Sequence, residues 1–173
     1  PPTEIVRLTF GEAEYVGLLR EYFMYDFKPY PVTVRFPRKS HLYDLRRGAY
    51  LGQTDSLDTD LSYEARLYAM LPYRVESVQV KGPSAARPGE TSVFAVSVAA
   101  GAGQPGLHVF RVEVLGPAGE PRPWYAANLR AEGGSASWTI PWALNERPGR
   151  FTLLAKDIAS GASCRASVVI GDR

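Results

Sequence analysis

Apolar residues recur at every second position along much of this chain, most regularly over residues 106–170. There Phe110 and Val112 share one face of an expected strand, while Arg111 and Glu113 take the opposite face. A period of two is the signature of a half-buried strand, because successive side chains point to opposite faces. Gly- and Pro-rich turns follow about every 8–12 residues, a spacing typical of a small β-sandwich.

The same pattern predicts strands in two halves, which divide near residues 71–73. In the first half we expect about six short strands, over residues 4–10, 14–24, 32–36, 41–45, 57–61 and 64–71. In the second half we expect about seven, over residues 75–81, 91–99, 108–114, 124–130, 136–142, 151–155 and 164–170. Many short strands with turn signals between them favour sandwiches over any helical fold.

Two segments of the first half have an ambiguous pattern. Residues 14–24 fit a helical stripe as well as a buried strand, and Gly17 together with the short length favours the strand. Pro37 follows Val34 and Phe36 and is expected to end their strand, because proline cannot donate to a sheet ladder.

We therefore expect an all-β protein of two small domains, an antiparallel β-sandwich over residues 1–73 and an immunoglobulin-like β-sandwich over residues 74–173. Cys164 is the only cysteine, so the Cys…Trp…Cys signature of antibody domains is missing and no intrachain disulfide can form. A single cysteine leaves the compartment open, whether reducing, secreted or periplasmic.

Composition and charge limit the classes of partner that we expect for this chain. The 173 residues are 45% hydrophobic and 22% charged, which is ordinary for a globular protein. The formal net charge is +2, and the basic residues are scattered, so a nucleic-acid partner is not expected. The sequence contains no run of about 18 apolar residues, so no membrane span is expected. The chain starts at Pro1 without methionine, which favours a piece of a longer polypeptide or a processed product.

Several segments carry a resemblance to a known class of protein. They are HVFRVEV at 108–114, PWYAAN at 123–128, IPWALN at 140–145, PGRFTL at 148–153 and DIASG at 157–161, with HLYDLRRGAYLG at 41–52 and ARLYAMLPY at 65–73 in the first half. Together they resemble the C-terminal β-sandwich region of large bacterial glycoside-hydrolase-like proteins of the multi-domain β-galactosidase type. The strand layout of the second half is also similar to immunoglobulin-like domains of the macroglobulin or fibronectin III type.

The resemblance implies a non-catalytic accessory region whose partner is the remainder of the parent polypeptide. No segment resembles the barrel of those enzymes or its paired catalytic carboxylates. An oligomer is compatible with this interpretation.

Candidate polar chemistry is sparse. Asp55, Asp58 and Asp60 are weak candidates for a calcium site, but their spacing is not that of an EF-hand, and solvated surface is the favoured interpretation. Neither a zinc-ligand spacing nor a phosphate-binding loop is present, so no cofactor is expected. His108 and Cys164 lie on inward faces by parity, where packing and hydrogen bonding favour structural roles.

Aromatic residues are the remaining candidates for ligand binding. Trp124 and Tyr125 interrupt the alternation after Pro123, and Tyr22 and Tyr25 belong to a second concentration of aromatic residues. Sugar rings stack on exposed aromatic faces, whereas buried rings only fill a core or an interface. Three functions stay open on this basis: a scaffolding accessory module, a carbohydrate-binding module, and, least favoured, a free-standing glycoside hydrolase.

Overall fold

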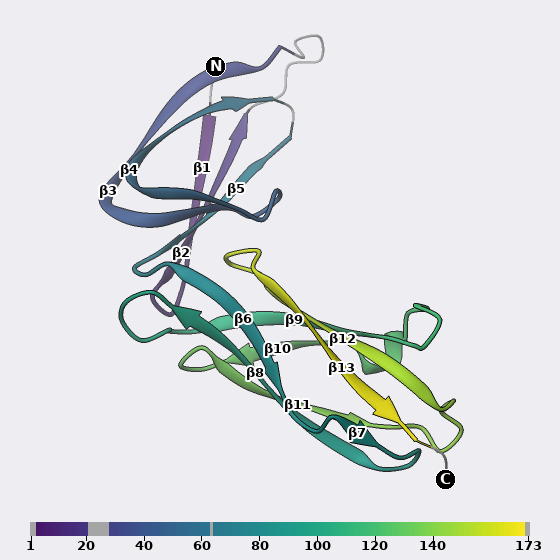
Figure 1. Ribbon diagram of the computed structural model, residues 1–173. Helices are drawn as coiled ribbons and strands as arrows, with labels where there is room; N and C mark the ends of the chain where they lie inside the picture. Colours follow the sequence, from purple (N-terminus) through teal and green to yellow (C-terminus); the bar gives the residue numbers. More distant parts are fainter. Residues whose placement is uncertain (1–2, 21–27, 63, 172–173) are drawn as a thin grey trace. The chain divides into compact units, whose positions relative to one another are not determined.

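The structure is a computed structural model that describes residues 3–20, 28–62 and 64–171 (Figure 1). Among these residues every regular element is a β-strand, apart from the 3-10 turn Pro123–Tyr125, which confirms the all-β class. The chain divides into two compact units: Pro1–Arg74 with Ala159–Gly161, and Val75–Ile158 with Ala162–Arg173. No helix in the described residues is long and apolar enough to cross a membrane.

The first unit is built on one antiparallel sheet. Its strands are β1 (Thr3–Phe10), β2 (Ala13–Arg20), β3 (Tyr30–Asp44), β4 (Ala49–Leu61) and β5 (Arg66–Leu71), in the spatial order β1-β2-β5-β3-β4. The part of residues 14–24 that is described belongs to β2, so the strand prediction is confirmed there; residues 21–27, including Tyr22 and Tyr25, lie outside the described residues.

Pro37 does not end its strand, so that prediction was wrong. The expected strands 32–36 and 41–45 are one long strand, β3, and the expected strand 57–61 is the end of β4. The register of β3 against β4 shifts between Arg35 and Ser40, and Pro37 lies within this irregular stretch. A bulge leaves a residue out of the ladder, so the missing N–H of proline costs no hydrogen bond.

The irregular stretch also explains how one sheet encloses a core. The buried cluster of the first unit comprises Val16, Leu18, Leu42, Leu61, Tyr68 and Met70. Val32 and Val34 of β3, Leu57 of β4, and Phe36 within the irregular stretch itself pack against this cluster. The long β3–β4 hairpin therefore bends over β2 and β5, which makes the unit sandwich-like with a single sheet.

The second unit is a two-layer sandwich. Its strands are β6 (Val75–Lys81), β7 (Ala85–Ala86), β8 (Thr91–Ala100), β9 (His108–Leu115), β10 (Ala127–Ala131), β11 (Ser135–Pro141), β12 (Gly149–Asp157) and β13 (Ser163–Ile170). One layer has the order β10-β9-β12-β13-β7 and the other β11-β8-β6. This is the expected immunoglobulin-like arrangement, with β7 added in parallel to β13.

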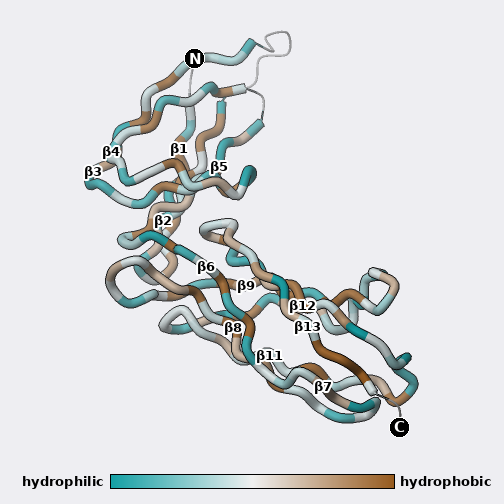
Figure 2. Tube along the Cα trace, in the orientation of Figure 1, coloured by the Kyte–Doolittle hydropathy of each residue, from teal (hydrophilic) through white to brown (hydrophobic). Residues whose placement is uncertain are grey.

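Alternation places the core of this unit much as predicted. The buried apolar residues include Phe94, Val96, Phe110, Val112, Val114, Trp138, Ile140, Trp142, Phe151, Leu153, Val168 and Ile170. Apolar and polar stretches can be followed along the strands in Figure 2. Cys164 is only partly buried, because the start of β13 is less covered than its end. The expected strand over residues 124–130 was wrong in its first part, because the 3-10 turn Pro123–Tyr125 comes first and β10 begins only at Ala127.

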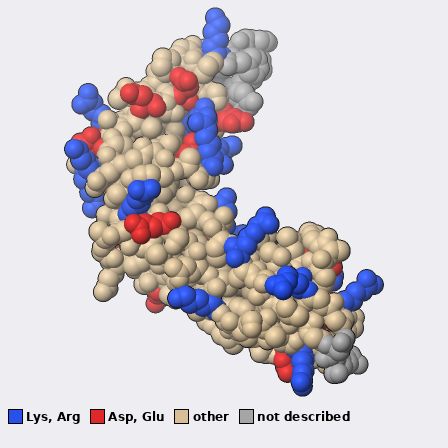
Figure 3. Space-filling model, in the orientation of Figure 1, with Lys and Arg blue, Asp and Glu red and all other residues tan. Residues whose placement is uncertain are grey.

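Charged side chains are spread thinly over the face of the molecule that Figure 3 draws. On the face drawn in Figure 3, acidic and basic groups are interspersed, and neither sign gathers into one continuous patch.

Candidate functional site

The second unit carries an open groove, which we call the Trp124 groove. It is lined by Ala118, Glu120, Arg122, Trp124, Ala143, Asn145, Glu146 and Arg147 and has a volume of about 610 Å³. These residues come from two connections, the one between β9 and β10 and the one between β11 and β12. Two loops at one end of a sandwich are a common place for binding residues, because the sheets hold them rigidly.

Trp124 is presented by the short turn Pro123–Tyr125. Proline fixes the backbone at the start of the turn, and the N–H of Ala126 donates to the carbonyl of Pro123 at 3.1 Å. Adjacent residues of the turn point in different directions, so Tyr125 is 6% exposed and Trp124 62% exposed. A tryptophan this exposed gains little from folding, and its ring is available to a ligand.

Tyr125 lies behind the groove. Its hydroxyl donates to Glu146 Oε2 at 2.7 Å and accepts the N–H of Ala143 at 2.8 Å. Its ring meets Trp142 edge to face, with centroids 5.2 Å apart. Burial is the main cause that raises the pKa of Tyr125 above its usual value. Tyr125 therefore ties the β11–β12 connection to the turn that presents Trp124.

Arg122 joins the two acidic residues of the groove. Its Nη2 lies 2.7 Å from Glu120 Oε1 and 3.3 Å from Glu146 Oε1. The guanidinium carbon lies 5.5 Å from the ring centroid of Trp124 and 5.9 Å from that of Phe151, within cation–π range of both rings. Arg122 thus holds the Trp124 ring and both carboxylates at once.

Glu120 is the more exposed of the two carboxylates. Its own backbone N–H is the main cause that lowers its pKa below the usual value, and the N–H of Ala118 and the guanidinium groups of Arg122 and Arg147 act in the same direction. A glycosidase acid needs the opposite, a raised pKa. The groove therefore offers Glu120 as a hydrogen-bond acceptor and not as a proton donor.

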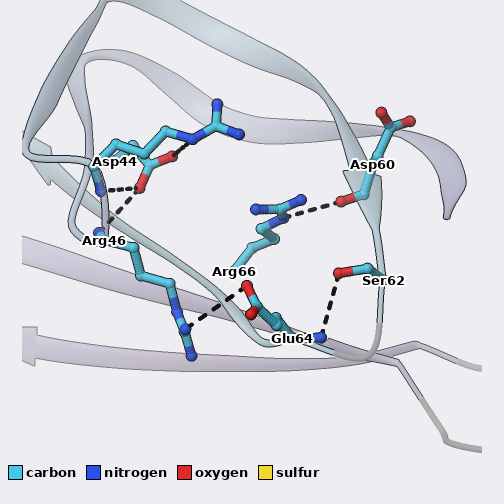
Figure 4. Close-up of polar contacts among 7 residues, drawn as sticks. Asp44, Arg46, Asp60, Ser62, Glu64 and Arg66 are labelled. Atoms are coloured by element: carbon cyan, nitrogen blue, oxygen red, sulfur yellow. Dashed lines mark hydrogen bonds and ion pairs between the residues drawn. The ribbon is translucent and has the colours of Figure 1, made fainter. Parts of the chain in front are cut away.

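A second hollow lies in the first unit, with a volume of about 230 Å³. Its lining includes Asp44, Arg47, Asp58, Asp60, Arg66 and Tyr68. Figure 4 shows that its polar groups contact one another: Arg66 Nε donates to the carbonyl of Asp60 at 3.0 Å. Asp44 accepts the backbone N–H groups of Arg46 and Arg47, both at 3.0 Å, and so closes the β3–β4 turn. These contacts serve the fold.

The aspartates considered for calcium lie on the surface of β4. Asp55, Asp58 and Asp60 are all exposed, and Asp58 accepts a hydrogen bond from the Thr33 hydroxyl at 2.6 Å. In the described part of the chain, no group of three His, Cys, Asp or Glu side chains is placed to hold a metal ion.

Of the aromatic candidates, Trp124 alone is found at a groove in the described residues. Its polar neighbours Glu120, Arg122 and Glu146 were not predicted as site residues. Arg122 lies two positions before Trp124, and that proximity was the only sequence signal for it.

No family model and no curated protein matches the chain. Similar solved structures include the CARDB domain of a Pyrococcus furiosus protein in complex with di-metal ions. It is 14% identical with a TM-score of 0.39 and covers 55% of this chain and 86% of that one.

Salmonella alpha-2-macroglobulin is 8% identical with a TM-score of 0.43, covering 98% of this chain and 16% of that one. A putative beta-galactosidase from Bacteroides fragilis is 10% identical with a TM-score of 0.32, covering 94% and 33%. The chain thus spans a small part of either larger protein, and at these scores the likeness carries no argument about function.

Proposed function

We propose that this chain is a non-catalytic accessory region of a larger carbohydrate-active protein, which packs on a catalytic body or mediates protein contacts. The observation that carries the proposal is the pairing within the Trp124 groove. Both carboxylates, Glu120 and Glu146, contact the same guanidinium group.

Glycoside hydrolysis needs two carboxyl groups that flank the scissile bond, one of them protonated. Because its pKa is lowered, Glu120 is a poor proton donor. Glu146 accepts a hydrogen bond from the Tyr125 hydroxyl, so this carboxylate is held in place as an acceptor. His108 and Asp157 form an acid–imidazole pair elsewhere in the second unit, and this pair is closed in the core with neither side chain exposed.

A panel of nitrophenyl glycosides tests this proposal. We expect the purified chain to release nitrophenol no faster than buffer at any pH between about 4 and 8, the range in which carboxyl groups of ordinary or raised pKa change charge. Turnover that disappears in Glu120→Gln or Glu146→Gln would overturn it.

One observation favours a second candidate, a carbohydrate-binding module. Trp124 is exposed at the edge of a groove whose other lining residues are mostly polar. A pull-down with insoluble polysaccharides measures this directly: retention that is lost in Trp124→Ala supports binding, and no retention on any polysaccharide leaves the scaffolding role alone.

A further inference from the structure

We infer that the Trp124 groove takes a neutral glycan, with one sugar ring stacked on Trp124 and its hydroxyls bound by Glu120, Asn145 and Arg147. This inference rests on the carbohydrate-binding candidate and adds the ligand class and the polar residues that select it.

The Trp124 ring, the platform on which a sugar would stack, is held in place before any ligand binds. The Arg122 guanidinium lies over the Trp124 ring, and Tyr125 meets that ring at 67° with centroids 5.9 Å apart. Arg122 and Tyr125 are themselves held by the buried Glu146. Because these contacts fix the ring, binding does not have to restrict a freely rotating side chain, and more of the contact energy appears as affinity.

Trp124 supplies a ring of the size and polarity that a sugar needs. The indole face is apolar and carries a partial negative charge, so it packs against the C–H groups of a pyranose. Trp124 is the one aromatic side chain that lines the groove, as far as the described residues show. One platform suits one ring, with neighbouring sugars extending into solvent.

The polar lining matches hydroxyl groups. A hydroxyl donates one hydrogen bond and accepts others. Glu120 accepts, Arg147 donates, and the amide of Asn145 does both; Asn145 and Arg147 are exposed, and the Glu120 side chain is 40% exposed. Glu120 can therefore accept a hydrogen bond from one sugar hydroxyl while Arg147 donates to another.

The charges and the aromatic content of the groove argue against an anionic sugar and against a proline-rich peptide. Two carboxylates, Glu120 and Glu146, oppose two guanidinium groups, Arg122 and Arg147, and Arg122 is already shared by both carboxylates. The groove therefore has no net positive charge to attract an anionic sugar such as a uronate, which would meet the carboxylate of Glu120 as well as the guanidinium of Arg147. A proline-rich peptide docks on several aromatic side chains, and this groove offers one.

The test compares soluble polysaccharides by isothermal titration calorimetry or affinity electrophoresis. The neutral set contains a β-glucan, a xylan, a galactan and a mannan; polygalacturonate and a proline-rich peptide represent the alternatives. We expect at least one neutral polymer to bind, with an affinity that is unchanged when the salt concentration is raised.

The variants identify the site. Trp124→Ala is expected to weaken binding about tenfold or more, and Trp124→Phe, which keeps a smaller ring, by less. Glu120→Gln is expected to weaken binding by a factor of about three to ten, since a hydrogen bond to a charged group becomes one to a neutral group. Val93→Ala is the matched control, because Val93 is an exposed apolar residue on β8, outside the groove. Unchanged thermal midpoints show that the variants fold.

The outcomes separate the inference from the candidate on which it rests. If no glycan binds, the carbohydrate-binding candidate itself fails. If polygalacturonate binds more tightly than every neutral polymer, glycan binding stands and the neutral class is wrong. Binding of the proline-rich peptide that is lost in Trp124→Ala overturns both, and glycan binding unchanged in Trp124→Ala shows that the groove is the wrong place.

Discussion

His108 and Asp157 form a polar pair inside the core of the second unit. His108 Nδ1 lies 2.8 Å from Asp157 Oδ1, and both side chains are 0% exposed. Parity along β9 predicted that His108 points inward and is hydrogen-bonded. Its partner could not be predicted, because Asp157 lies 49 positions away and approaches only when β12 pairs with β9.

Removal of one member of this pair should be costly. His108→Ala leaves Asp157 buried without its imidazole partner, so we expect the free energy of unfolding to fall by about 3–5 kcal/mol. Urea denaturation followed by tryptophan fluorescence measures it. Arg111→Ala is the control, because its exposed ion pair with Glu113 is worth about 0–1 kcal/mol. Equal losses in the two variants would contradict the prediction.

Tyr125 should make stability depend on alkaline pH. Burial raises the pKa of its phenol in the folded state, whereas the unfolded chain releases that proton near pH 10. The stabilisation is therefore fully present below about pH 10 and is lost as the pH rises towards the folded pKa, because only the unfolded state then gains from ionisation.

Tyr125→Phe removes the ionisable group and the hydrogen bonds together. At neutral pH we expect the variant to be less stable by about 1–3 kcal/mol, since Glu146 and the N–H of Ala143 lose a partner. Above pH 10 its stability should fall less steeply than that of the parent protein. Urea titrations from pH 8 to pH 11 measure both, and parallel profiles would count against the burial argument.

Local patterns predicted the strands better than their joins. Alternation placed β9, β11, β12 and β13 because each strand has one buried face. The two residues of β7 carry no pattern of their own and are a strand only through their pairing with β13. The fusion of two expected strands into β3 also depends on a pairing, with β4, that tolerates Pro37.

One pair of residues tests the layer arrangement of the first unit. Leu18 and Ile5 are register partners on β2 and β1 and share a face, yet Leu18 is 1% exposed and Ile5 60%. We expect Leu18→Ala to cost about 2–5 kcal/mol of unfolding free energy, because it opens a cavity under the bent β3–β4 hairpin.

Ile5→Ala deletes the same kind of side chain beside it and should change stability by no more than about 0.5 kcal/mol. Thermal and urea unfolding of the two variants decide the matter. Similar losses would mean that the folded-over hairpin covers β1 as well as β2.

The candidate site combines one residue with a sequence signal and several residues without one. Trp124 was predicted because the segment after Pro123 breaks the strand period. Glu120 and Glu146 lie 26 positions apart, and the fold brings them to one guanidinium group through two different connections. Charge pairing of this kind has no local signature, so the sequence pattern pointed to Trp124 and gave no indication of the polar residues around it.

The whole Trp124 groove is built from the second unit. Every residue that lines it falls between Ala118 and Arg147, and both layers of the sandwich belong to residues after Arg74. The buried side chains of the two layers, such as Phe94 and Phe110, supply a core of their own. A sandwich of this size can bury enough apolar surface to fold alone.

We therefore expect residues 74–173, expressed without the first half, to unfold in one cooperative transition. We also expect them to bind the same neutral glycan with an affinity within about threefold of the full chain, which is a difference below about 1 kcal/mol. Circular dichroism during heating and calorimetry measure these two properties. A broad transition with dye-binding apolar surface would show that the proposed boundary between residues 73 and 74 is not a domain boundary. A cooperative transition with lost binding would instead show that residues 74–173 alone do not make the complete binding site.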